Sequence, residues 1–288
     1  MVGAARTGVA EFIYGAPVTE IELRHLGPTA YREARPEVES DSPVVLVHGF
    51  PQSSRMWVGL LGPLTAAGRR CVAPDLYGLG DSNDDSPATF EHNLEAFGEL
   101  LDSLELDRVA LVVHDWGGFI GLAWACEHPE RVESLVISDT GFFSDGRWHG
   151  IAEAIRGEQG EQLVAAIDRA GFAAVLRSSE ASAFDDAEID AYWAPFEQGR
   201  GKRATLEFYR SMDFAKLAPY EGRLAELGVP TLLLWGEDDQ FAPVAAAKRF
   251  EREIPSSRLV VVEGAGHFVF DEQPERCVRE VVGFLSAS

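Results

Sequence analysis

The sequence is poor in cysteine and contains no long apolar run. Three cysteines occur in 288 residues, and the wide spacing of Cys71, Cys126 and Cys277 forms neither a disulfide framework nor a zinc motif. We expect them to behave as small apolar residues. No run approaches the roughly 18 apolar residues that a membrane span requires, and residues 1–15 contain no apolar signal-peptide core. These absences predict a cytoplasmic protein that does not bind a membrane.

Positive charge is also scarce. Lys and Arg number 25 against 47 Asp and Glu, which gives a net charge of -22, and lysine occurs only as Lys202, Lys216 and Lys248. This balance opposes attraction to nucleic acid and to anionic membranes. Acidity of this size fits a high-salt source, yet Arg-rich, Lys-poor usage also follows from genome base composition. The charge therefore leaves the source open and names no substrate.

Short apolar runs alternate with amphipathic segments through most of the sequence. The runs predict strands buried on both faces at 44–47, 109–113, 135–137, 231–235 and 259–262. Apolar residues at helical spacing predict helices at 94–104, 119–127, 244–253 and 275–285. This alternation indicates an α/β fold in which helices flank a mostly parallel central sheet.

The alternation stops between residues 140 and 212. Strand-like runs disappear there, and helix-like segments occupy 151–156, 162–170 and 187–196, with a Gly-rich loop expected at 199–202. The pattern predicts a main domain built from 1–139 and 213–288. It predicts a helical cap domain, 140–212, inserted after one strand.

The strongest chemical signal is the segment 111–118, which reads Leu-Val-Val-His-Asp-Trp-Gly-Gly. A buried strand that ends in a tight turn and opens a helix is the context of a nucleophile elbow, with Asp115 where serine is more common. A carboxylate is already nucleophilic at neutral pH, so it can displace a leaving group from an alkyl carbon without losing a proton first. Taken alone, an Asp in this position is equally expected as a helix cap.

A second motif, His48-Gly49-Phe50-Pro51, follows another predicted strand and would bring its loop amides to the elbow. We expect the backbone N–H groups of Phe50 and Trp116 to be oxyanion donors. An ordinary turn capped by His48 is the alternative.

A histidine follows the last predicted strand, in Gly264-Ala-Gly-His267-Phe. It comes last in the order nucleophile, acid, histidine that the elbow context leads us to expect. The predicted acid is Asp239, after the preceding strand, and the alternative acid is Asp139, at the end of the strand before the cap. Either carboxylate would orient the imidazole and stabilise its cation.

Other polar motifs favour structural roles. His25, His92, His114 and His149 show no metal-ligand spacing, so we expect surface or packing positions for them. The segment 73–82, which contains two glycines, is interpreted as a structural turn and not as a phosphate loop. We expect no metal and no organic cofactor.

Together these motifs resemble the α/β-hydrolase superfamily across essentially the whole chain. Asp at the elbow narrows the resemblance to haloalkane dehalogenases and epoxide hydrolases, and Val-Val-His-Asp-Trp-Gly-Gly is closer to dehalogenases, because epoxide hydrolases usually have Gly where Val113 stands. The segments 157–163, 192–196 and 202–206 are also similar to dehalogenase caps. The spacing typical of the family favours Asp239 over Asp238 as the acid.

The resemblance implies that the Trp116 indole binds a departing halide. Dehalogenases add a second donor, which is commonly Asn where Phe50 stands or else a cap tryptophan, and the Phe50 side chain cannot serve. Trp148 is the first substitute and Trp193 the second. Simple packing is the alternative role for each tryptophan.

The predicted function is hydrolysis of small apolar haloalkanes by water, giving an alcohol and a halide through an aspartyl ester. Epoxide hydrolysis by the same ester route is the alternative. Epoxide hydrolases generally use two cap tyrosines, and this chain has Tyr209 where one of them would be, while the other is missing unless Tyr192 serves. A noncatalytic small-molecule receptor on this fold is a third interpretation.

Overall fold

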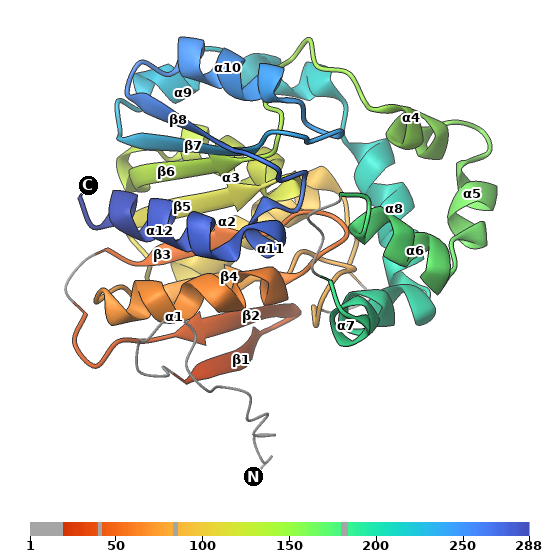
Figure 1. Cartoon of the computed structure of the whole chain (residues 1–288), viewed down its shortest axis with the longest axis horizontal. Coiled ribbons are helices and arrows are strands. Elements are labelled where there is room, and N and C mark those ends of the chain that lie inside the picture. Colours follow the sequence, from red (N-terminus) through yellow and green to blue (C-terminus); the bar gives the residue numbers. More distant parts are fainter. Residues whose placement is uncertain (1–19, 40–41, 83–85, 180–183, 288) are drawn as a thin grey trace.

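The computed structural model has a central sheet between two layers of helices, and further helices lie at one end of the sheet (Figure 1). The structure describes residues 20–39, 42–82, 86–179 and 184–287. Residues 1–15, whose composition was considered above, lie outside these ranges. None of the described helices is long and apolar enough to cross a membrane.

The sheet is eight-stranded within the described residues, with the order β1-β2-β4-β3-β5-β6-β7-β8. β1 and β2 form an antiparallel edge. The other six of these strands, which are β4, β3, β5, β6, β7 and β8, run parallel to one another. The carboxyl ends of the parallel strands therefore meet at one edge, where ligands bind in open α/β sheets. The strands are β1 (Ile21–Leu26), β2 (Thr29–Ala34), β3 (Val44–Val47), β4 (Cys71–Pro74), β5 (Val109–His114), β6 (Val132–Ser138), β7 (Thr231–Gly236) and β8 (Ser257–Val262).

The five predicted strands correspond to β3, β5, β6, β7 and β8, and the predicted α/β fold with a mostly parallel central sheet is confirmed. The four-residue β4 was not among the predicted strands, and the apolar pattern did not reveal β1 or β2. Five of the six residues of β1 are exposed, and β2 contains the buried Glu33, whose charge is balanced by Arg70 and Arg35. A buried ion pair of this kind breaks the hydrophobic pattern from which strands are predicted.

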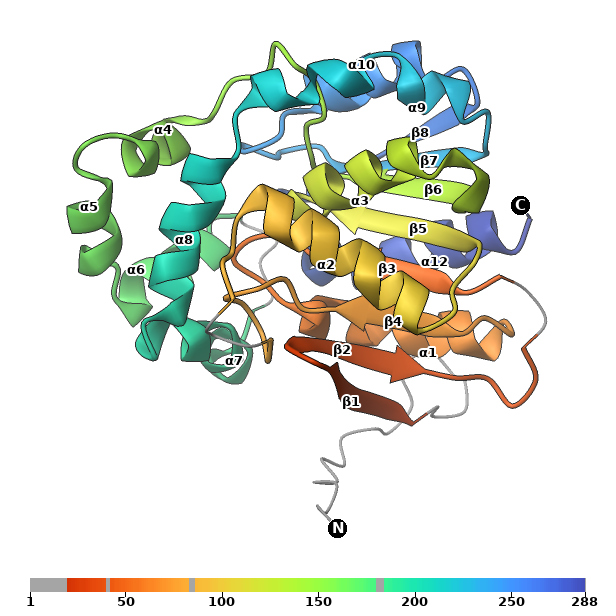
Figure 2. The same ribbon diagram turned by 180° about the vertical axis from the view of Figure 1, so that it is seen from behind.

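Two apolar cores lie on opposite faces of the sheet. α1 (Val58–Ala66) and α12 (Pro274–Leu285) cover one face, which Figure 1 shows in front. α2 (Phe90–Ser103), α3 (Trp116–Glu127) and α10 (Val244–Glu253) cover the other face, and Figure 2 shows α2 and α3 in front. α3 is buried on nearly all sides because α2, α9 (Arg223–Glu226) and η3 (Phe214–Tyr220) pack over it. The three cysteines are free and buried within these cores.

Between β6 and β7 the chain forms helices α4 (Gly150–Arg156), α5 (Gly160–Ala166), α6 (Arg169–Leu176), α7 (Asp186–Glu197) and α8 (Arg200–Ser211). These insertion helices lie beyond one end of the sheet, away from α1 and α12 (Figures 1 and 2). Side chains from α8 contact the loop after β3 and the start of α3, so the insertion lies over the carboxyl ends of the parallel strands.

Two local predictions in the insertion are wrong. The segment 162–170 is not one helix, because α5 ends at Ala166 and Asp168 caps α6 by accepting a hydrogen bond from the Gly171 N–H at 2.8 Å. The segment 199–202 is not a loop, since Gly199 alone makes the turn at φ 85° and α8 begins at Arg200. A single residue in the left-handed region is enough to separate two helices.

Candidate active site

The segment between β5 and α3 forms a strained elbow at Asp115, with φ 50° and ψ -118°. Glycine is required on its helical side, because a Cβ on Gly117 would lie 2.1 Å from the Val47 carbonyl oxygen and one on Gly118 would lie 2.2 Å from Thr140 Oγ1. Asp115 occupies the cap position of α3, but its side chain makes no capping hydrogen bond. The helix-cap interpretation is therefore wrong, and the carboxylate is free to act elsewhere.

The Asp115 carboxylate faces two of the predicted partners. Its Oδ1 accepts a hydrogen bond from the Phe50 N–H at 2.7 Å, and its Oδ2 lies 3.6 Å from His267 Nε2. Burial favours the neutral acid, but the hydrogen bond and charge of His267 outweigh it and lower the pKa of Asp115. The side chain remains 21% exposed, so a small molecule can reach the ionised carboxylate.

His267 lies between two carboxylates. Its Nδ1 hydrogen-bonds to Asp239 Oδ2 at 2.9 Å, while the Asp239 Oδ1 accepts hydrogen bonds from the Phe241 and Ala242 N–H groups at 2.7 and 3.0 Å. Burial opposes a charged imidazole, but the charges of Asp239 and Asp115 raise the pKa of His267 well above its usual value. The free enzyme therefore holds an imidazolium between two carboxylates at neutral pH.

Asp139, the alternative acid, is directed to other partners. It is fully buried, its Oδ1 accepts a hydrogen bond from the Gly236 N–H at 2.9 Å, and its Oδ2 accepts one from Ser138 Oγ at 2.5 Å. Burial and the nearby charge of Asp239 raise the pKa of Asp139 well above its usual value. The geometry thus places Asp239 against His267, whereas Asp139 bonds to Gly236 and Ser138.

The loop after β3 holds one backbone donor against the nucleophile. His48 is fully buried and fixes this loop, since its Nδ1 bonds to the Gly49 carbonyl at 2.8 Å and its Nε2 accepts from the Leu76 N–H at 2.9 Å. A Cβ on Gly49 would lie 2.4 Å from the Asp115 Cβ, so only glycine permits this approach. The N–H of Trp116 opens α3 and has no partner within its own helix, as at every helix start.

Residues 75–82, which follow β4, form a structural turn, as predicted. Asp75 accepts hydrogen bonds from the Ser54 N–H at 2.7 Å and from the Asp81 N–H at 2.9 Å, and a Cβ on Gly80 would lie 2.2 Å from the Asp75 carboxyl carbon. These bonds tie the turn to the loop after β3. The turn therefore supports the position of the Phe50 amide.

Aromatic side chains pack around the nucleophile. They come from the loop after β3, from α3, from the segment before α4, and from α8 and η3, so they join the main sheet to the insertion. Ring centroids lie 4.7 to 6.3 Å apart. We call this group the aromatic cluster: Phe50, Trp116, Phe119, Trp148, Phe208, Tyr209 and Phe214. Such surroundings favour an apolar ligand.

Sequence and structure comparisons now bear on this site. A family model described as alpha/beta hydrolase fold matches residues 42–274. The chain belongs to this family. A haloalkane dehalogenase of Sphingobium indicum is 30% identical over 265 residues, which cover 84% of this chain and 88% of that protein. Epoxide hydrolase 3 of Siraitia grosvenorii is 28% identical over 291 residues, which cover 84% of this chain and 91% of that protein.

Solved structures agree with the sequence relatives. The crystal structure of a haloalkane dehalogenase from Bradyrhizobium elkani USDA94 matches with a TM-score of 0.81 and 26% identity, covering 94% of this chain and 98% of that chain. The protein is therefore an α/β hydrolase that resembles haloalkane dehalogenases, with epoxide hydrolases as further relatives.

Two indole rings pack against each other in the aromatic cluster of this α/β hydrolase. Trp116 and Trp148 stack with ring centroids 5.7 Å apart and planes 20° apart. The Trp148 Nε1 is buried and has no hydrogen-bond partner. Burying an N–H donor without a partner costs free energy, so such a group is expected to face a ligand.

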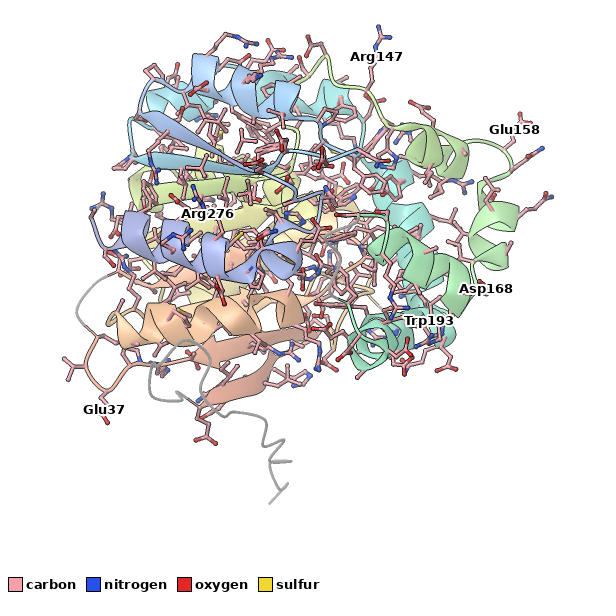
Figure 3. All side chains as sticks on the ribbon, viewed as in Figure 1. Glu37, Arg147, Glu158, Asp168, Trp193 and Arg276 are labelled. Atoms are coloured by element: carbon pink, nitrogen blue, oxygen red, sulfur yellow. The ribbon has the colours of Figure 1, made fainter. Side chains whose placement is uncertain are left out.

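Trp193, the second candidate donor from the cap, lies elsewhere. It packs on Phe172 and Phe196, and Lys202 lies 6.0 Å from its ring. Figure 3 shows it in the part of the insertion formed by α6 and α7. The structure therefore brings Trp148, and not Trp193, to Trp116.

The two candidate tyrosines, Tyr209 and Tyr192, have different neighbours. Tyr209 is buried in the aromatic cluster, and its hydroxyl is hydrogen-bonded to Trp116. Burial raises the pKa of Tyr209, with the charge of Asp115 adding to the rise and the Trp116 bond opposing it. Tyr192 instead directs its hydroxyl to Gln52 Nε2, 3.5 Å away. Only Tyr209 is placed beside the nucleophile by these contacts.

The four histidines expected at surface or packing positions agree with that expectation. His25 is exposed, His92 stacks on Tyr77, and His114 is buried with its ring centroid 5.0 Å from that of His267. His149 packs against Tyr209 and Phe241 at ring centroid distances of 6.2 and 5.1 Å, which places it at the edge of the aromatic cluster. Sequence reasoning did not predict these neighbours, for which the only available signal was the position of His149 next to Trp148.

Proposed function

We propose that this α/β hydrolase removes halide from apolar haloalkanes and releases an alcohol, through a covalent ester of Asp115. The observation that carries the proposal is the buried, unpartnered N–H of Trp148 beside Trp116, since a departing halide needs N–H donors. The apolar ring cluster and the ionised carboxylate support the same chemistry.

In the first step, an Asp115 oxygen forms a bond to the carbon that carries the halogen. The carbon–halogen bond breaks, and its electron pair leaves with the halide. In our proposal the Trp148 indole N–H binds that halide, and the Trp116 indole joins it by exchanging its Tyr209 bond. No proton moves in this step, so no base is needed.

In the second step, formation of the ester has removed the Asp115 charge, so His267 releases its proton to solvent. The neutral imidazole then takes a proton from water, and the resulting hydroxide attacks the ester carbonyl carbon. The N–H groups of Phe50 and Trp116 stabilise the oxyanion, and Asp239 stabilises the imidazolium. The alcohol leaves with the proton from His267, and the Asp115 carboxyl group that hydrolysis forms passes its own proton to His267, which restores the carboxylate and the imidazolium. The proposed cap, residues 140–212, excludes bulk water during both steps.

Halide release tests this function directly. Wild-type protein should release bromide from 1-bromohexane and form hexan-1-ol in equal amounts. Trp148→Phe should weaken bromide binding and slow halide release by about ten-fold, because hydrogen bonds to charged groups are among the stronger ones. Trp193→Phe is the matched control, since it makes the same change away from the nucleophile. Equal loss in both variants, or no halide release by the wild type, would contradict the proposal.

Epoxide hydrolysis is the second candidate, and Tyr209 is the observation that favours it. Its hydroxyl bonds to Trp116 and lies close enough for the Asp115 charge to raise its pKa. A phenol so placed can donate a proton to the oxygen of an opening epoxide. Diol formation from styrene oxide that is lost in Tyr209→Phe, with no halide release from 1-bromohexane, would favour this candidate over dehalogenation.

A further inference from the structure

His149 stands at the edge of the candidate active site, in a position that gives it a free hydrogen-bond donor. Its ring meets Tyr209 edge to face, at 89°, and meets Phe241 at 69°. Phe241 in turn contacts His267, with ring centroids 5.1 Å apart. The residue is half-buried, so one side of the ring remains accessible.

The local backbone determines which ring nitrogen carries the proton. His149 caps α4, and its Nδ1 accepts a hydrogen bond from the Ala152 N–H at 3.4 Å. An imidazole nitrogen that accepts cannot carry a proton, so a neutral His149 has its proton on Nε2. The two ring nitrogens point in divergent directions. Nε2–H therefore points away from α4, and none of the described residues accepts a hydrogen bond from it.

The charge of this ring also follows from its surroundings. Burial lowers the pKa of His149, although the Asp115 charge opposes this, and His267 adds to the lowering. The ring is therefore neutral at neutral pH. An anionic ligand would meet the Asp115 charge and a protein of net charge -22, with no cation on His149 to offset them. A neutral acceptor is the ligand that this donor suits.

We propose that the Nε2–H of His149 recognises a neutral oxygen acceptor, an ether or hydroxyl, in the part of the substrate remote from the carbon that Asp115 attacks. The inference rests on the proposed function for the identity of the reacting end. The substrates best suited to the site are then haloalkanes with an oxygen in the chain. The aromatic cluster binds the carbon atoms, and His149 selects for the oxygen.

Matched substrates separate this role from general packing. 1-Bromohexane is compared with the three ethers of equal chain length: 1-bromo-4-methoxybutane, 1-bromo-3-ethoxypropane and 1-bromo-2-propoxyethane. For each protein, the ratio of kcat/KM for an ether to kcat/KM for 1-bromohexane is measured. The ratio removes effects that act on all substrates alike.

Two variants give the expected pattern. His149→Phe keeps a ring but loses the donor, so the ratio for the best ether should fall by about five-fold, the worth of one ordinary hydrogen bond. His149→Gln places a side-chain N–H near the original Nε2 and should restore most of the ratio. If no ether ratio differs between wild type and His149→Phe, the inference is overturned, even though the protein releases halide.

A binding measurement keeps the inference separate from the proposed function. Calorimetry is used to compare hexan-1-ol with 4-methoxybutan-1-ol, 3-ethoxypropan-1-ol and 2-propoxyethanol, because these alcohols need no turnover. A wild-type protein that releases no halide refutes the proposed function. An ether-alcohol preference that disappears in His149→Phe would still support the donor role. Equal preference in both proteins, or no binding of any alcohol, overturns it.

Discussion

The His267 imidazole lies between Asp239 and Asp115, so its pKa depends on the state of both carboxylates. In the free enzyme both are charged, and the imidazole holds its proton. Formation of an Asp115 ester removes one of these charges, which lowers the pKa of His267 toward the range where it can accept a proton from water. The proposed first step thus prepares the base for the second.

The two candidate acids are separated by isosteric substitution. Asp239→Asn removes the charge bonded to His267, so we expect kcat to fall by roughly 10³ to 10⁴-fold, as for the acid of a serine-type triad. Asp139→Asn changes a carboxyl that bonds to Gly236 and Ser138 instead of His267, so it should leave kcat near the wild-type value. Steady-state halide release by both variants checks this prediction. A larger loss in Asp139→Asn would reverse the assignment of the acid.

The pH dependence should differ between the two steps. The pKa of Asp115 is lowered, so the carboxylate and the alkylation rate should persist as pH falls below the usual range of Asp. Ester hydrolysis needs neutral His267, so it should slow as pH falls through the pKa of His267 in the alkylated enzyme. Rapid-quench measurement should therefore show more alkyl-enzyme at lower pH. A parallel decline of both rates would contradict this account.

At the scale of elements, the site depends on how closely the loop after β3 approaches the start of α3. Two glycines, Gly49 and Gly117, leave room for that approach, and a Cβ on either of them would lie within 2.4 Å of a neighbouring atom. The nearest atoms to Gly117 are backbone atoms, which cannot move aside as a flexible side chain can. Both the loop after β3 and the start of α3 therefore need glycine at the point of contact.

Substitution of one of these glycines should damage the site and the fold together. Gly49→Ala places a Cβ against Asp115, so we expect a loss of about 1–3 kcal/mol in the free energy of unfolding and a marked fall in kcat. Gly59→Ala in α1 meets no atom within 4 Å and should stabilise the protein by up to about 1 kcal/mol. Thermal unfolding and halide release measure both effects. Equal behaviour of the two variants would show that the approach is not tight.

At the scale of the whole molecule, five of the six parallel strands were predictable because each contains a run of apolar residues. β3 matches its predicted bounds, and β5 to β8 differ from theirs by a few residues. The elbow at Asp115 and the position of His267 were predictable for a related reason, since motifs at strand ends gather at one edge of a parallel sheet. The local sequence pattern therefore predicted that Asp115 and His267, which are far apart in the sequence, lie at the same edge of the sheet.

Other features depended on tertiary contacts that no local pattern encodes. Asp239 was predicted as the acid, but the structural reason is tertiary. The Asp139 carboxyl oxygens accept hydrogen bonds from Gly236 and Ser138. The position of His149 follows from the way the segment before α4 folds back onto Tyr209, which lies 60 residues further along the chain. Helix boundaries in the insertion were set by single residues, Asp168 and Gly199.

The central claim is that Asp115 becomes covalently bonded to carbon, and mass spectrometry of a hydrolysis-deficient variant tests it most directly. His267→Ala lacks the base for the second step but keeps the nucleophile. After incubation with 1-bromohexane, the intact protein should gain the mass of one hexyl group, and peptide mapping should place that group on Asp115. An unmodified protein, or a hexyl group found on another residue, would contradict the account.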